Sequence, residues 1–252
     1  MNLIGVNKFD EVDKYLTENN IEILYNIKNG TNDNKISKVA NNVIHCVFTC
    51  SEPHGPHGEV YAAISSSLTN YNDNIPILPH IVDIPYHEDN MIKELNIPEE
   101  AVVFGRHGGK AQFDIKIVQD IIYNIAKSNP TIYFIFLNTY TFCEKLPNII
   151  HLDTIIDTNL KRKFINTCDA MIWARSDGET FGLSIAEFSI CNKPVIAANI
   201  RYDAHYKLLK NYGLWYSSTD ELINHIKYIV TTDKKKLQKK DWNAYRSKYN
   251  RM

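Results

Sequence analysis

Short β-branched and apolar runs alternate along this chain with stretches of helical spacing, and this alternation constrains the fold more than any other feature. AVVFG at residue 101 is such a run, and in residues 115–127 apolar positions recur every three or four residues. Strands that alternate with helices form parallel sheets covered by helices. The sequence therefore predicts an α/β fold.

The alternation occurs twice. In the first 80 residues we predict strands at NLIGV, IEILYNI, VIHCVF, YAAIS and IPILP, with helices over residues 9–19 and 35–41 and a short helix after YAAIS. Residues 80–100 contain two prolines and are expected to form a connector. From residue 101 we predict strands at AVVFG, TIYFIFL, NIIHL, AMIWA and PVIAA, with helices over residues 115–127, 160–167 and 182–191. Two such series in tandem predict a cleft between two domains, with ligands bound beyond the carboxyl ends of the strands.

Composition excludes several classes of protein. The chain has 252 residues and a formal net charge of −1, so it has no overall basic field for nucleic acid. No apolar run approaches the ~20 residues that span a bilayer, and the first residues lack the plan of a signal peptide. Five cysteines without a CxxC pair favour a reducing compartment. We therefore expect a soluble cytoplasmic protein, and the sequence leaves a homodimer open.

The end of the chain is basic. Residues 234–252 contain eight lysines and arginines and only one acidic residue, Asp241. Such a run is either a solvated helix face or a peripheral contact with an anionic membrane. Trp242, Tyr245 and Tyr249 recur at helical spacing, so we predict a final helix that packs on the body of the protein.

A glycine-rich loop follows the strand at residue 101. In FGRHGGKAQFD, the cations Arg106 and Lys110 lie four residues apart among glycines, a pattern that suits a polyphosphate. The loop is not a P-loop, because the glycine spacing is one residue short and Ala111 replaces the Ser or Thr that holds magnesium. The alternative is a turn with exposed cations.

The segment ARSDGETFGLSIAEFSICNKPVIA has the strongest signal. A strand ends in a polar loop, and a helix then begins near Gly182 with free amides that form an anion site. Glu179 and Glu187 lie before and within this helix, where carboxylates can accept hydrogen bonds from the paired hydroxyls of a ribose and a sugar. By spacing alone they could equally be exposed helix glutamates.

These residues resemble the signature of family 4 glycosyltransferases with the GT-B fold, E-x-F-G-L-x-x-x-E followed by P-V-I-A. FGRHGGKAQFDI is similar to the family's G-R…K segment, and IPILPHIVDIP to its interdomain crossing. The resemblance runs from about residue 61 to the end and is specific over residues 101–200. Short length and a wealth of Asn, Ile, Lys and Tyr resemble enzymes encoded by large DNA viruses. The sequence departs from the family in its first domain, which is short and lacks the early glycine-rich loop.

The resemblance implies two Rossmann-like domains that face each other across a cleft, the N-terminal one reduced. It places an acceptor-side domain at residues 1–82, a nucleotide-sugar domain at 83–230 and a helix packing back on the N-terminal domain at 231–252. It also implies the roles of site residues: Glu179 contacts the donor sugar and Glu187 the ribose. The diphosphate is bound by Arg106, Lys110, Phe181, Gly182 and Leu183.

The activity implied is retaining transfer of a hexose, with mannose from GDP-mannose as one candidate, from a nucleotide diphosphate sugar to a glycan or glycoprotein acceptor. No cofactor and no metal ion are expected, and the absence of an Asp-x-Asp motif fits this. Two alternatives remain open, a nucleotide-sugar 2-epimerase and a non-catalytic nucleotide-sugar binding module.

A histidine loop, TCSEPHGPHGEVYAAIS, follows a predicted strand of the first domain. His54 and His57 are candidate catalytic residues there, because imidazole can hydrogen-bond the sugar or the charge that develops on the leaving phosphate. Metal binding with Glu52 and a plain turn are the alternatives, although the ligand spacing is irregular.

Overall fold

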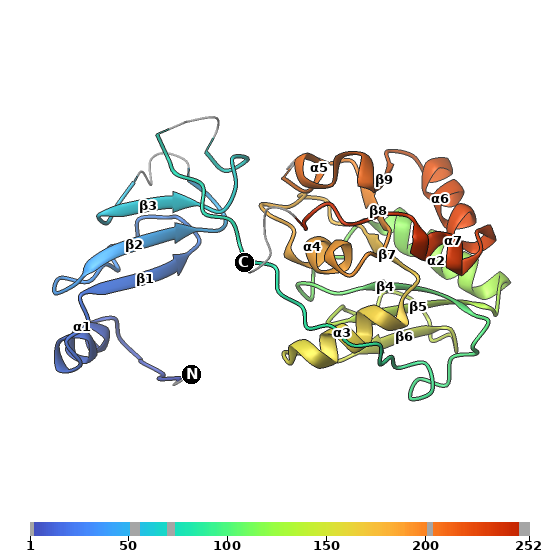
Figure 1. Ribbon diagram of the computed structural model, residues 1–252, viewed down its shortest axis with the longest axis horizontal. Coiled ribbons are helices and arrows are strands. Elements are labelled where there is room, and N and C mark those ends of the chain that lie inside the picture. The colour runs from blue at the N-terminus through green and yellow to red at the C-terminus, as the bar shows by residue number, and fades with distance from the viewer. Residues whose placement is uncertain (1–2, 51–55, 70–73, 201–203, 247–252) are drawn as a thin grey trace. The chain divides into compact units, whose positions relative to one another are not determined.

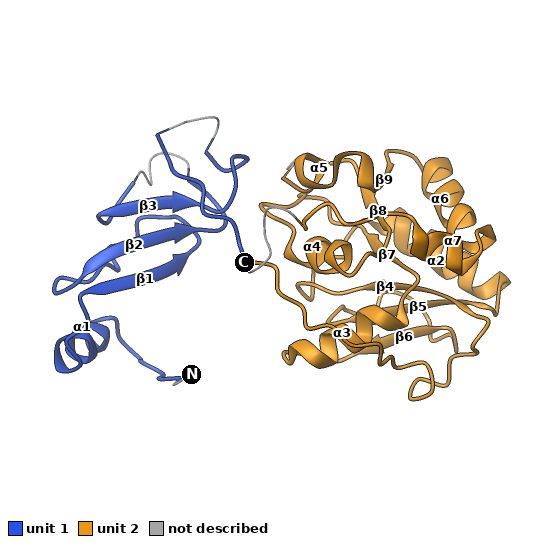
Figure 2. Ribbon diagram, in the orientation of Figure 1, with its two compact units in different colours: residues 1–80 blue, residues 81–252 orange. Residues whose placement is uncertain are grey.

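The computed structural model describes residues 3–50, 56–69, 74–200 and 204–246, and it divides the chain into two compact units. Unit 1 comprises residues 1–80 and unit 2 residues 81–252 (Figure 2). Each unit contains its own all-parallel sheet, so the α/β prediction is confirmed for both. No helix in the described ranges is long and apolar enough to cross a membrane.

Unit 1 has one helix and three strands in its described residues (Figure 1). The elements are α1 (Asp10–Glu18), β1 (Ile23–Lys28), β2 (Asn41–Cys46) and β3 (Val60–Ala63), and the strand order is β1-β2-β3. Three acidic side chains lie in the first turn of α1, where they interact favourably with the helix dipole. Ile44, Cys46 and Ala63 are fully buried and form the centre of this small core.

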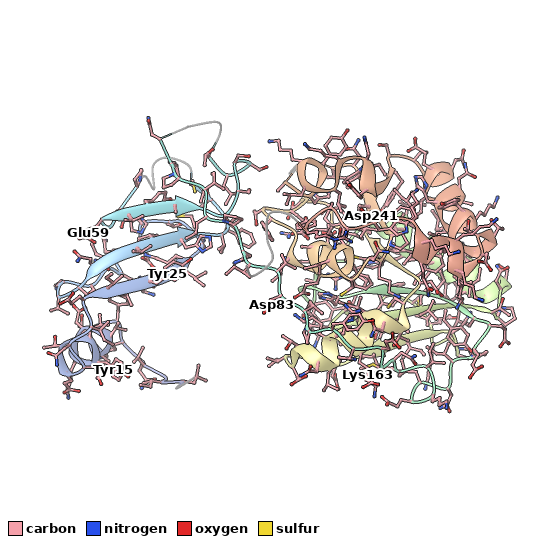
Figure 3. All side chains as sticks on the ribbon, in the orientation of Figure 1. Tyr15, Tyr25, Glu59, Asp83, Lys163 and Asp241 are labelled. Carbon is pink, nitrogen blue, oxygen red and sulfur yellow. The ribbon has the colours of Figure 1, made fainter. Side chains whose placement is uncertain are left out.

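Unit 1 differs from the sequence-based expectation between β1 and β2. Residues 35–41 contain no helix. The side chains of Ser37 and Asn42 instead form hydrogen bonds with backbone groups of this segment. Asn42 Oδ1 accepts from Ser37 N at 2.7 Å, and Ser37 Oγ accepts from the amides of Val39 and Ala40. Such local side-chain bonds compete with a helical ladder. One face of the sheet consequently exposes Ile23, Tyr25 and Ile27 of β1. Tyr25 is labelled in Figure 3.

Three further predictions for unit 1 are wrong. Residues 3–6 of NLIGV form no strand, and turns rather than a helix follow YAAIS. IPILP contributes a single bridge, between Ala63 and Ile77. All three segments are short, and short apolar runs form strands only where a neighbouring strand is free to pair with them.

Unit 2 contains a six-stranded parallel sheet in the order β6-β5-β4-β7-β8-β9. Its first strand, β4, lies at the centre, as in a doubly wound dinucleotide-binding fold. The strands are β4 (Val102–Arg106), β5 (Ile132–Leu137), β6 (Ile149–Leu152), β7 (Ala170–Trp173), β8 (Val195–Ala198) and β9 (Gly213–Tyr216). The helices are α2 (Lys116–Ser128), α3 (Thr158–Thr167), α4 (Leu183–Ile190), α5 (Ala204–Leu209), α6 (Thr219–Thr231) and α7 (Lys234–Lys239), with a 3₁₀ turn at Lys210–Tyr212.

The helices cover both faces of this sheet. The connection through α2 leads from β4 to β5, whereas the connection through α4 leads in the opposite direction, from β7 to β8. Right-handed crossovers therefore put α2 and α4 on opposite faces. α6 packs beside α2, and α3 packs beside α4, where the rings of Phe164 and Phe188 are 6.2 Å apart.

Of the final helix predicted over residues 231–252, the described part after α6 is helical only in α7, and residues 240–246 are not helical. Trp242 and Tyr245 are buried, but against α4 of unit 2. Ser189 Oγ donates to Trp242 O at 2.8 Å and accepts from Ala244 N at 3.0 Å. The side chains of α4 thus fix this backbone in a non-helical form that still buries both rings.

Gly105 packs closely against Cys168. A Cβ atom added there would lie 2.2 Å from Cys168 Sγ. We therefore expect Gly105→Ala to destabilise the protein by about 1–3 kcal/mol, the usual cost of overpacking a core. Urea unfolding measures this, with Gly5→Ala as the control because no atom lies within 4 Å of its added Cβ. Adding Cys168→Ala should restore part of the loss; no rescue would mean that the cost has another origin.

Candidate functional site

The centre of the unit 2 sheet is a topological switch point. β4 and β7 are neighbours, and the chain leaves them in opposite directions. In open α/β sheets such a point creates a crevice at the carboxyl ends of the strands. Arg106 ends β4 and Lys110 lies in the loop after it, while Glu179 lies in the loop after β7. The fold thus brings the two loops that the sequence singled out to one edge of the sheet.

Side chains bond these two loops together. Asp114, in the segment after β4, accepts from Ser176 N at 2.8 Å and from Ser176 Oγ at 2.6 Å. The backbone amide of Asp114 donates to Ala174 O at 3.1 Å. These bonds hold the loops in a defined relation before any ligand arrives.

A charged centre, which we define as Arg106, Asp114, Arg175 and Glu179, lies between the loops. Glu179 Oε1 accepts from Trp173 Nε1 at 2.9 Å, and Oε2 accepts from Arg175 at 3.1 Å. Burial raises the pKa of Glu179, although Trp173 and the arginines act in the opposite sense. Burial likewise lowers the pKa of Arg106 to about 10. Because the effective dielectric constant is low around buried groups, these charges would interact strongly with a ligand.

Arg106 points into its own loop. It is 3% exposed and donates to Thr139 Oγ1 at 2.6 Å and to Gly109 O at 2.9 Å. A third bond, at 3.3 Å, reaches Asn138 O. The guanidinium therefore joins the glycine-rich loop to the segment after β5. Its role toward a diphosphate stays a prediction, because most of its donors already have protein acceptors.

Lys110 is exposed and lies beside a polar pocket of about 290 Å³ at the carboxyl ends of β5 and β6. Its ammonium is 5.2 Å from the centroid of the Tyr140 ring. The polar pocket is lined by Lys110, Asn138, Thr139, Tyr140, Thr141, His151, Leu152, Asp153 and Thr154. This is a polar, hydrogen-bonding recess, with the charges of Lys110 and Asp153, at the edge where the fold places ligands.

The N-terminus of α4 faces the same edge of the sheet. Gly182 precedes the helix with φ 85° and ψ 52°, a left-handed conformation that favours glycine. Phe181 is buried, and its ring packs 6.2 Å from that of Tyr245. Leu183 is the first helical residue and is 39% exposed. The first amides of a helix have no intrahelical acceptor, so this end can bind an anion.

Glu187 is buried between two basic side chains. Lys161 Nζ of α3 donates to Oε1 at 2.8 Å, and His107 Nε2 lies 3.0 Å from Oε2. Burial alone would raise the pKa of Glu187, but His107 and Lys161 outweigh it and hold this pKa below its ordinary value. Glu187 is thus not an exposed helix residue; it is an ionised acceptor at a fixed position.

The histidine loop belongs to unit 1. His54 lies outside the described residues. His57 is buried, its Nε2 lies 3.3 Å from Lys28 Nζ, and its ring centroid is 5.3 Å from that of Tyr61. Lys28 also pairs with Asp33. His57 thus sits in a polar cluster beyond the end of β2, and its part in a sugar site stays a prediction.

In the part of the chain that the structure describes, no group of three or more His, Cys, Asp or Glu side chains is placed to hold a metal ion. The expectation of a metal-free site stays a prediction.

No protein-family model matches the chain, and no curated protein sequence does. Solved structures do. A glycosyltransferase from Rickettsia africae has a TM-score of 0.68 at 15% identity, over 99% of this chain and 80% of that one. HepE from Anabaena, in complex with UDP-glucose, has a TM-score of 0.69 at 16% identity, over 96% of this chain and 78% of that one. WaaG, a glycosyltransferase involved in lipopolysaccharide biosynthesis, has a TM-score of 0.62 at 13% identity, over 97% and 80%.

The chain has the GT-B fold. The similarity to these glycosyltransferases and the parallel sheets of both units confirm the predicted fold class.

Several residues of the candidate site were missed from the sequence. His107 and Lys161 hold Glu187, and Arg175 holds Glu179. Asn138 and Tyr140 follow β5 directly and line the polar pocket. Their position in the sequence could have identified them, because LNTYT begins at the last residue of a predicted strand. Polar residues that follow parallel strands lie at the carboxyl edge of the sheet, where ligands bind. Lys161 had no such signal, because its contact with Glu187 spans 26 residues.

The position of Glu187 predicts a pH-dependent stability. Its folded pKa lies below the unfolded value, so the ionised group stabilises the fold above that value and the benefit is lost as the pH falls through the folded pKa. At pH 7, Glu187→Gln should cost about 2–5 kcal/mol, because the buried His107 and the half-buried Lys161 lose their ionised partner. Urea unfolding at pH 7 and near pH 3 measures the difference, which should shrink in acid. Exposed Glu144→Gln is the control, and an equal cost at both pH values would contradict the assignment.

Proposed function

We propose that this chain is a glycosyltransferase that moves a hexose from a nucleotide diphosphate sugar to a glycan acceptor. The observation that carries the proposal is the pair of glutamates around the N-terminus of α4. Glu179 lies just before the helix in the charged centre, and Glu187 lies on its second turn. An anion site between two fixed carboxylates matches a diphosphate between two groups that carry hydroxyls.

In this proposal Glu187 accepts hydrogen bonds from the ribose. Both of its oxygens already contact a basic side chain, but a carboxylate has about four lone-pair sites. Lys161 and His107 therefore hold the carboxylate ionised and oriented while leaving capacity for ribose hydroxyls. The base would lie toward the polar pocket beside Lys110. HepE, which shares the fold, was solved with UDP-glucose, and this supports a nucleotide sugar as donor.

Charge stabilisation at the diphosphate falls mainly to the exposed Lys110 and the first amides of α4. Arg106 acts indirectly, because its hydrogen bonds fix the conformation of the glycine-rich loop and its buried guanidinium adds a positive charge. We propose that these groups stabilise the leaving diphosphate as the glycosidic bond breaks, where preorganised donors have their largest effect.

Glu179 is held by Trp173 and Arg175, a setting that suits hydrogen bonding to sugar hydroxyls more than covalent attack. We therefore propose retention through attack on the face that the diphosphate leaves. We also propose that His54 and His57 contribute to catalysis through hydrogen bonds to the sugar or to the leaving phosphate. Mannose from GDP-mannose remains one candidate donor, beside UDP-hexoses.

Titration of UDP-, GDP- and ADP-hexoses, followed by transfer and hydrolysis assays, tests the function. Lys110→Met should weaken binding of the matching nucleoside diphosphate about tenfold, the loss expected for one charge-assisted hydrogen bond, and should weaken the monophosphate less. Lys127→Met is a matched control, since its ammonium also lies over a tyrosine ring, 5.6 Å from Tyr123. Equal losses for both ligands would remove Lys110 from the diphosphate site. Binding without transfer or hydrolysis would identify a binding module instead.

Excess chelator should leave donor binding and turnover unchanged. The positive charge that a metal ion supplies in other transferases comes here from Lys110, Arg106 and the N-terminus of α4. Initial rates with EDTA, and after addition of manganese or magnesium, measure this. A strict manganese requirement would contradict the mechanism and direct attention to the histidine loop as a metal site.

A further inference from the structure

An apolar pocket of about 470 Å³ opens at the carboxyl ends of β8 and β9. It lies on the face of the sheet that α2 and α6 cover, whereas Glu187 lies on the other face, in α4. Ile117 and Ile121 of α2, Ala198 of β8 and Leu222 of α6 form its walls. Ile117 is 52% exposed, so part of this apolar wall faces water. Pockets of this size and character bind small molecules.

Among the described residues, the lining contains no charged side chain, and its polar members are neutral. Asn199, Ser217 and Thr219 place an amide and hydroxyls among the apolar walls. The N-terminus of α6 borders this pocket, but Asp220 and Glu221 in its first turn oppose an anion there, so a phosphate or carboxylate would lack a favourable partner. Burying an unpaired charge is costly. A hydrocarbon chain would bury its surface against isoleucine and leucine, and a hydroxylated head group could bond the neutral polar residues. The lining therefore selects an uncharged amphiphile.

Two residues that line the apolar pocket connect to the charged centre, one through Trp173 and one through the peptide chain. Tyr216 lines the pocket, and its hydroxyl donates to Trp173 O at 3.0 Å, while the indole of Trp173 donates to Glu179. Ile115 also lines the pocket and directly follows Asp114 of the charged centre. The apolar pocket is thus linked to Glu179 through the buried side chains of Tyr216 and Trp173.

We propose that the apolar pocket binds the hydrocarbon chain of an amphiphilic acceptor, whose hydroxylated head group lies toward the charged centre. The acceptor role rests on the glycosyltransferase function proposed above, whereas chain binding by itself does not. The acceptor is then a glycolipid or another alkyl-linked sugar alcohol rather than a free soluble glycan.

Binding of n-octyl β-D-glucoside below its micelle concentration, compared with methyl β-D-glucoside, tests chain binding on the full chain. We expect the octyl compound to bind at least about tenfold more tightly, because two buried methylenes suffice for this factor. Ile117→Asp should abolish most of the difference, since it puts a charge into the apolar wall. Ile156→Asp, at an 87% exposed isoleucine outside the pocket, should leave it intact. Circular dichroism confirms that both variants are folded, and UDP or GDP affinity should be equal in both.

A photoreactive alkyl diazirine gives a second readout that needs no variant, and it should label peptides that contain residues 115–122 or 216–222. Equal affinity for octyl and methyl glucoside, labelling elsewhere, or the same loss in Ile117→Asp and Ile156→Asp would overturn the proposal. If the protein transfers sugar but methyl and octyl acceptors react equally well, the acceptor assignment fails and the transferase function stands. If it binds the octyl chain but no nucleotide sugar, the proposed function fails and the pocket stands.

Discussion

The pairing of β4 with β7 is the contact on which the rest of unit 2 depends. Asp169, just before β7, closes one end of the pair, because its amide donates to Val103 O at 2.7 Å and its carboxylate accepts from Val103 N at 2.8 Å. Asp114 and Ser176 close the other end. Between them, Gly105 lets Cys168 and the ring of Phe188 approach the strand. Without this junction the loops after β4 and β7 would not meet, and the crevice at the switch point would not form.

The two glutamates beside α4 show how one short segment can hold carboxylates of different character. Burial dominates at Glu179 and raises its pKa, whereas His107 and Lys161 overcome burial at Glu187 and lower its pKa. Environments that push the pKa values of neighbouring groups apart are typical of functional sites, although ion pairs with purely structural roles do the same. Here the bonds to Glu187 come from two other elements, α3 and the glycine-rich loop, so its position is set by tertiary structure and not by α4 alone.

The sequence predicted unit 2 better than unit 1, and the reason is physical. Strands buried on both faces are nearly continuous apolar runs, and those of β5 and β7 are unmistakable as IYFIFL and AMIW. The segment 35–41 also has a composition compatible with a helix, but Ser37 and Asn42 satisfy its backbone locally. The helical spacing of Trp242 and Tyr245 correctly predicted that both rings are buried. It wrongly predicted that the backbone between them is helical. Residues Glu179, Gly182 and Glu187 could be found because they are close in sequence; Lys161 and Thr139 could not, because only folding brings them to their partners.

The burial of Arg106 determines which cation at the carboxyl edge of the unit 2 sheet can contact a ligand. An arginine at the end of a central strand would ordinarily be read as the main ligand of an anion, yet its donors go to Thr139, Asn138 and Gly109. Those bonds tie the glycine-rich loop to the segment after β5, which forms a wall of the polar pocket. The exposed cation is then Lys110, placed at the rim of the polar pocket rather than at its base. The charged centre consequently separates a polar recess beyond β5 and β6 from an apolar one beyond β8 and β9, and a ligand with chemically different ends could be oriented by that contrast alone.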